Sequence, residues 1–132
     1  MATIIDPQLS IEVDRATKMA SVRVTCGIEF TEFEVNSMNL LGISYTLECH
    51  LLNMEMLYPE TVINFALQQY PRVRDGAKRF EEPVFQAVAP TKELHLYIFG
   101  KDSLVAELRL SNADLGTLSV KRTPTTLVDL AA

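Results

Sequence analysis

The stretch ASVRVTCGIEF, residues 20–30, alternates apolar and polar side chains along its whole length. Valine, cysteine, isoleucine and phenylalanine fill every second position, and arginine, threonine, glycine and glutamate fall between them. Because successive side chains of a strand point to opposite faces, this period of two predicts a strand with one buried face. The stretch QLSIEVD, residues 8–14, has the same period, and the polar RATK, residues 15–18, separates the two. The sequence therefore predicts an antiparallel hairpin over residues 8–30.

The same alternation recurs along the chain. It is found in ISYTLECHLL (43–52), PVFQAVAP (83–90), LVAELRL (104–110) and TLSVKR (117–122), and the last apolar run, TTLVDL (125–130), is a candidate edge strand. Roughly seven to nine short strands separated by turn residues are typical of two antiparallel sheets packed face to face. We expect an all-β protein, a single β-sandwich domain over residues 1–132. Its architecture resembles the immunoglobulin type, although the chain has no tryptophan and its two cysteines are too close for the usual inter-sheet bridge.

The middle of the chain is harder to interpret. FTEFEVN, residues 30–36, shifts the apolar positions by one, which predicts a bulge or corner, and NSMNLLG, residues 36–42, is typical of a loop. PETVINFALQQYP, residues 59–71, fits both a helical stripe and a strand alternation, and the β-rich surroundings favour a strand. We expect a long irregular or partly helical excursion between Pro59 and Pro90.

The stretch ELHLYIFGKDSLVAELRLS, residues 93–111, predicts a second hairpin whose first strand, 94–99, is apolar on both faces. Leu94, Leu96 and Ile98 would form one face, and His95, Tyr97 and Phe99 the other. An enclosed tyrosine or phenylalanine buries about 150–250 Å², so both would leave a large apolar patch if uncovered. Three things could bury this aromatic face: the excursion between Pro59 and Pro90, a protein partner, or a ligand held under the excursion.

The partner hypothesis predicts a non-catalytic protein-interaction or assembly module that binds a protein partner or associates with itself. Its interface residues would be His95, Tyr97 and Phe99, with His50 beside them.

Composition narrows the possible partners. The chain has 132 residues, of which 48% are hydrophobic and 22% charged, as in globular proteins. The first residues, MATIIDPQLSIEVDR, lack the basic and apolar segments of a signal peptide, so we expect a cytoplasmic protein with no membrane partner. The net charge of −5 opposes binding to nucleic acid.

Few residues offer chemistry. Cys49 and His50 are neighbours on a predicted strand, so their side chains should lie on opposite faces and cannot form a nucleophile and base pair. Cys26 and Cys49 fall at apolar positions, which favours buried thiols over a disulfide. The alternative function is a small-ligand-binding or metal-dependent protein in which Glu48, His50 and His95 meet on neighbouring strands. The sequence otherwise predicts no enzyme and no cofactor.

Overall fold

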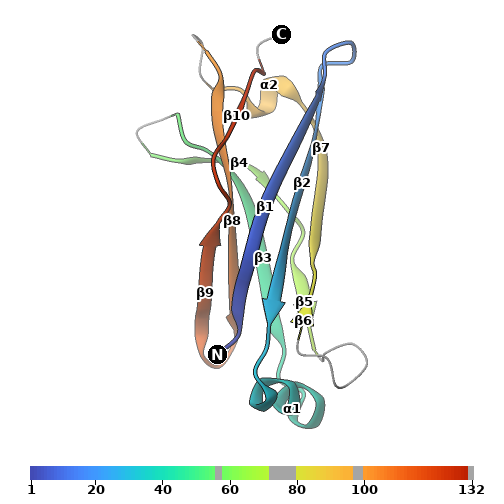
Figure 1. Cartoon of the computed structure of the whole chain (residues 1–132), viewed down its shortest axis with the longest axis vertical. Helices are drawn as coiled ribbons and strands as arrows, with labels where there is room; N and C mark the ends of the chain where they lie inside the picture. The colour runs from blue at the N-terminus through green and yellow to red at the C-terminus, as the bar shows by residue number, and fades with distance from the viewer. Residues whose placement is uncertain (56–57, 72–79, 97–99, 131–132) are drawn as a thin grey trace.

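A computed structural model describes residues 1–55, 58–71, 80–96 and 100–130 (Figure 1). In these residues the chain is mostly β, with two antiparallel sheets and two short helices. The two sheets run along the length of the molecule, and α1 and α2 lie at its opposite ends (Figure 1).

The first sheet is built on the hairpin that the sequence predicts. β1 (Thr3–Asp14) pairs with β2 (Met19–Glu29), and β2 pairs on its other side with β6 (Phe80–Glu81) and β7 (Val84–Pro90). The register of β1 shifts between Ile5 and Gln8, where Asp6 has a positive φ of 46° and Pro7 has no N–H to donate. The hairpin is confirmed, and β7 has β2 as its strand partner within the described residues.

The second sheet is centred on β3 (Tyr45–Asn53) and β8 (Asp102–Asn112), which pair over nearly their full lengths. β4 (Glu60–Asn64) and β5 (Gln68–Tyr70) pair with the other side of β3, and β9 (Gly116–Arg122) and β10 (Thr126–Val128) with the other side of β8. Residues 59–71 are therefore β rather than helical, as the sequence favours, but they form two short strands separated by residues 65–67 instead of one. Residues 72–79, within the predicted excursion, lie outside the described residues.

The core consists of the alternating apolar side chains that the sequence places inward. Val24, Ile28, Leu47 and Leu108 are fully buried, and residues of both sheets form one hydrophobic cluster. Phe65, between β4 and β5, packs edge to face on Phe85 of β7 with 5.8 Å between ring centroids. These two rings join the sheets along one side.

The bulge and loop expected over residues 30–42 are wrong, because this segment forms α1 (Glu32–Leu41). Thr31 and Glu34 form a capping box: the Thr31 hydroxyl accepts from Glu34 N–H at 3.3 Å, and Glu34 Oε1 accepts from Thr31 N–H at 3.0 Å. Gly42 ends the helix in the left-handed conformation, with a φ of 69°. Local capping thus overrides the strand-like alternation of Phe33 and Val35.

The strand predicted over residues 94–99 is wrong in its first three residues. Leu94 is the last residue of α2 (Thr91–Leu94) and is fully buried, and His95 and Leu96 have no regular structure. Pro90 ends β7, and its fixed φ suits the turn into a helix. Tyr97, Ile98 and Phe99 lie outside the described residues.

Neither helix in the described part of the chain has the length and apolar character needed to span a membrane.

Candidate functional site

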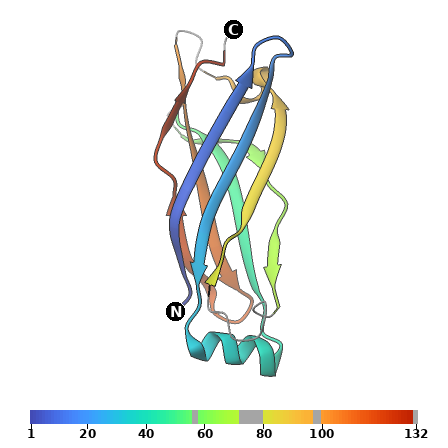
Figure 2. The same cartoon turned by 45° about the vertical axis from the view of Figure 1, so that its right-hand side comes forward.

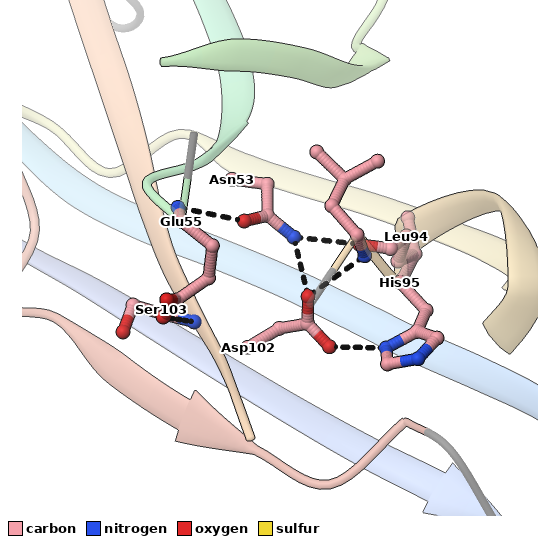
Figure 3. Close-up of polar contacts among 7 residues, drawn as sticks. Asn53, Glu55, Leu94, His95, Asp102 and Ser103 are labelled. Atoms are coloured by element: carbon pink, nitrogen blue, oxygen red, sulfur yellow. Dashed lines mark hydrogen bonds and ion pairs between the residues drawn. The ribbon is translucent and has the colours of Figure 1, made fainter. Parts of the chain in front are cut away.

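A buried polar cluster lies at the α2 end of the molecule (Figure 3). Asp102 and Asn53 have no exposed surface. Asp102 Oδ2 accepts a hydrogen bond from His95 Nδ1 at 2.5 Å, while Oδ1 accepts from Leu96 N–H at 2.8 Å and from Asn53 Nδ2 at 2.9 Å. Asn53 Nδ2 also donates to the carbonyl oxygen of Leu94 at 2.9 Å.

Strand alternation explains why these polar groups face inward. Asn53 is two residues after the buried Leu51 on β3, and Asp102 is two residues before the buried Leu104 on β8, so both continue the core faces of their strands. Glu55 extends the network, since its N–H donates to Asn53 Oδ1 at 3.0 Å and its Oε1 accepts from Ser103 N–H at 2.9 Å. The cluster fastens the segment after α2 to both central strands.

The His95 and Asp102 pair has one chemical consequence. Because the Asp102 carboxylate can only accept, His95 Nδ1 carries the proton of this hydrogen bond. In the neutral imidazole Nε2 is then free of a proton and can accept one, as in many general bases. However, in the described residues no hydroxyl or thiol hydrogen-bonds to His95. Within these residues the His95 and Asp102 pair holds the segment after α2 against β8.

His50 lies on the outer face of β3, as the alternation predicts. Its Nδ1 lies 2.6 Å from Asn64 Oδ1, and its Nε2 lies 3.5 Å from Glu48 Oε2. Cys49 is fully buried on the opposite face, so the prediction that Cys49 and His50 diverge is confirmed. The structure thus brings Glu48 and His50 together, whereas His95 bonds to an inward-facing carboxylate.

A metal site needs more donors than this arrangement supplies. Within residues 1–55, 58–71, 80–96 and 100–130, no three histidine, cysteine, aspartate or glutamate side chains gather in a way that could hold a metal ion.

Both cysteines are buried and free, as the sequence predicts. Burial raises the pKa of the Cys26 thiol to about 12. Burial, with a smaller contribution from the nearby Cys26, raises the pKa of Cys49 to about 12 as well. Thiols of this kind stay protonated near neutral pH and are poor nucleophiles.

An exposed apolar face on α1 was missed by the sequence analysis. Val35 and Met38 point into the core, but Phe33, Leu40 and Leu41 are 78%, 81% and 74% exposed. We call these last three residues the apolar face of α1. The helix lies across the end of the molecule, below both sheets (Figure 2). The signal that could have revealed it is the capping box at Thr31 and Glu34, followed by Gly42.

Two further exposed apolar side chains lie at the same end. Met1 is 76% exposed, and the adjacent Ala2 N–H donates to Glu34 Oε2 at 2.8 Å, which fastens the N-terminus to α1. Leu115 is 67% exposed in the turn between β8 and β9, close to the start of β3 that follows α1. Five exposed apolar side chains therefore lie at the α1 end, while others, such as Tyr58, Val88 and Leu127, are exposed elsewhere in the described residues.

No protein-family model, curated protein or solved structure matches this chain. The function must therefore be inferred from the arrangement of its own side chains.

Proposed function

We propose that this chain is a non-catalytic protein-interaction module whose docking surface is the apolar face of α1. The observation that carries the proposal is the exposure of Phe33, Leu40 and Leu41, each at 74% or more, on one short helix. Clustered exposed apolar side chains mark interaction surfaces, whereas isolated ones are ordinary. A helix that docks an apolar stripe into a partner is a common recognition mode.

The charges around α1 favour a protein over a membrane as the partner. The helix contains Glu32 and Glu34 and no lysine or arginine. Helices that lie on membranes usually carry basic residues on their polar face, which attract anionic lipids. With a net charge of −5, the chain is also a poor ligand for phosphate backbones.

We further propose an immunoglobulin-like β-sandwich as the architecture and the cytoplasm as the location. The common hydrophobic cluster of the two antiparallel sheets supports the sandwich. The free, buried state of Cys26 and Cys49 supports a reducing compartment.

The interface hypothesis drawn from the sequence remains a separate prediction. Tyr97 and Phe99 lie outside the described residues, His50 is half-exposed on β3, and His95 is engaged by Asp102. Protein contacts through His95 would lie away from the apolar face of α1, because the described start of the segment after α2 lies at the opposite end of the molecule (Figure 1).

Site-specific photo-crosslinking tests the docking surface. A photoreactive phenylalanine analogue at position 33, introduced in cells that express the protein, should give a discrete protein adduct. The same analogue at position 127 is the matched control, because Leu127 is an exposed apolar residue on β10, away from α1. The adduct from position 33 should weaken when Leu40→Ser is added. Equal yields from positions 33 and 127 would overturn the proposed function.

A further inference from the structure

We infer that the outer edge of β7, at Gln86 and Val88, binds an extended segment of a partner polypeptide, which adds to the first sheet as one more strand. The groups that would hold this segment are the backbone N–H and C=O of the two residues. The edge lies apart from the apolar face of α1, so this inference goes beyond the proposed function.

The backbone of β7 turns half of its polar groups away from β2. Directly after β7, Thr91 N–H donates to the carbonyl oxygen of Lys18 at 3.0 Å, which continues the pairing with β2. Because bonded and non-bonded pairs alternate in an antiparallel ladder, the odd-numbered residues of β7 bond to β2. Gln86 and Val88 therefore point their N–H and C=O outward. No strand of the described residues pairs with this outer side of β7.

A side-chain amide already takes the place of one strand N–H on this edge. Gln68 Nε2, from β5 of the second sheet, donates to the carbonyl oxygen of Val84 at 2.8 Å. Val84 has the same parity as Gln86 and Val88, so this oxygen belongs to the same outward row of acceptors. A primary amide donates through an N–H just as a peptide bond does. The edge therefore accepts amide donors, and an extended backbone supplies both these donors and the matching acceptors.

β7 lacks the features that usually keep an edge strand from pairing. Natural edge strands are very short or carry charges, prolines or bulges. The other edge of the first sheet, β1, has a register shift beside Pro7, and β9 in the second sheet carries Lys121 and Arg122. β4, β5, β6 and β10 have five residues or fewer. β7 has seven residues, none of them charged, and its one proline is the last residue, Pro90.

The space beside the second half of β7 suits a single strand. At its first residues β7 is bridged to the second sheet by Gln68 and by the ring of Phe65. At its other end α2 follows directly. The edge between these limits, residues 86–90, is roughly 17 Å long, enough for about five residues of an extended segment. Figure 2 shows β7, in yellow, as the outermost strand of its sheet, with β4 and β5 beyond it. The edge of a folded sheet would bring further strands toward β5, whereas a lone segment would not.

The side chains along the edge favour apolar, β-branched residues in the bound segment. Val88 is 64% exposed on the outer face, and Ala87 and Ala89 are half-buried against the core. An added strand would place alternate side chains next to Val88 and next to the two alanines. The small alanines leave room on the inner face for larger side chains such as valine and isoleucine.

Amide hydrogen exchange followed by NMR tests this edge. The probe is a short peptide of alternating valine and threonine with a lysine at each end, since β-branched residues favour strands and lysines limit self-association. At saturating peptide, exchange of the Gln86 and Val88 amides should slow at least about fivefold, because both gain an acceptor. The Ala87 amide already bonds to β2 and should change far less. Unchanged exchange at Gln86 and Val88 up to roughly 1 mM peptide would overturn the inference.

A methylated peptide separates backbone pairing from apolar contact. N-methylation of every second amide, on the side that would face β7, keeps the side chains of the peptide and removes its donors. The methylated peptide should bind the wild-type protein at least about tenfold more weakly. Equal affinity of the two peptides would overturn the inference, and this test needs no variant of the protein.

Val88→Pro tests the same pairing from the side of the protein. Proline removes the N–H of residue 88, and because this N–H points away from β2, the sheet loses no hydrogen bond. The variant should bind the unmethylated peptide at least about tenfold more weakly. Val88→Thr is the matched control, since it keeps the N–H and the branched shape, and it should bind within about twofold of the wild type. Circular dichroism verifies that both variants are folded, and equal affinity of the two would overturn the inference.

The occupant and the place of the site are tested separately. Exchange at Gln86 and Val88 that slows with protein concentration alone would mean that a second copy occupies the edge, and would overturn a foreign segment as the occupant. Phe33→Ser with Leu40→Ser, which removes the apolar face of α1, should leave peptide binding unchanged. Loss of peptide binding in that folded variant would overturn the placement of the site on β7. Failure of the docking surface on α1 leaves the edge of β7 unaffected.

Discussion

Asp102 has no exposed surface, and a carboxylate removed from water needs hydrogen-bond donors to replace the water it has lost. Donors come from two places in the chain: Asn53 at the end of β3, and the adjacent His95 side chain and Leu96 N–H after α2. Sequence reasoning placed His95 on an exposed strand face because it saw only local alternation. The network could not be predicted, since its members meet only in the folded chain.

Removing the Asp102 carboxylate should strongly destabilise the fold. Asp102→Ala leaves buried donors on Asn53 and Leu96 without their acceptor, at a cost of about 3 kcal/mol in the free energy of unfolding. Urea denaturation followed by circular dichroism measures the change. Glu48→Gln, on the outer face of β3, is the control and should cost less than about 0.5 kcal/mol. Equal stability of the two variants would show that the cluster does not fasten the segment after α2.

The two cysteines should be unreactive in the folded protein. With a pKa of about 12 for both thiols, only about one part in ten thousand is thiolate at pH 8, and burial blocks access as well. A thiol-specific chromogenic disulfide should therefore label neither residue under native conditions and both in denaturant. Rapid labelling of the native protein would contradict the placement of Cys26 and Cys49 in the core.

At the scale of elements, α1 shows how a few capping residues decide whether a segment forms a strand or a helix. Phe33 and Val35 alternate as in a strand, but the Thr31 and Glu34 capping box satisfies the helix N-terminus, and Gly42 provides the left-handed residue that ends the helix. β2 has no such conflict, so its alternation was sufficient to predict it. Elements whose local signals agree were predictable, and α1 was not.

The ionisation of Glu34 should make the free energy of unfolding depend on pH in the acid range. Burial raises its pKa, but hydrogen bonds from Thr31 and Ala2, and the charge of the N-terminus, together lower it below its usual 4.5. A lowered folded pKa means that the stabilisation is present above the unfolded pKa and is lost as pH falls through the folded pKa. As the pH falls from neutral through the folded pKa, the wild type should therefore lose more of its free energy of unfolding than Glu34→Gln does.

Urea midpoints at several pH values measure this difference. Glu12→Gln, an exposed change on β1, is the control and should follow the wild-type pH profile. Parallel profiles for the wild type and Glu34→Gln would show that the ionised Glu34 does not stabilise the junction of α1 and the N-terminus.

At the scale of the whole molecule, the strands were more predictable than their order. The inward positions of β8, such as Leu104 and Leu108, follow directly from alternation. Yet β8 pairs with β3, far away in the chain, and β2 pairs with both β1 and β7. Long-range pairing depends on how whole faces fit together, which no local pattern encodes. The apolar face of α1 was unpredictable for the same reason, since exposure depends on what the helix covers.

The packing of the two sheets along one side should depend on Phe65 and Phe85. Their rings meet edge to face between the β4 to β5 connection and β7, so each sheet contributes one partner. Each single change to alanine should cost about 3 kcal/mol, and a double-mutant cycle should give a coupling of about 1 kcal/mol. Phe65 and Val35 provide the comparison cycle, using Val35→Ala, because Val35 lies on α1 at the end of the molecule, and their coupling should be smaller. Additive losses for Phe65 and Phe85 would mean that the rings do not hold the sheets together, and that the remaining core does so without them.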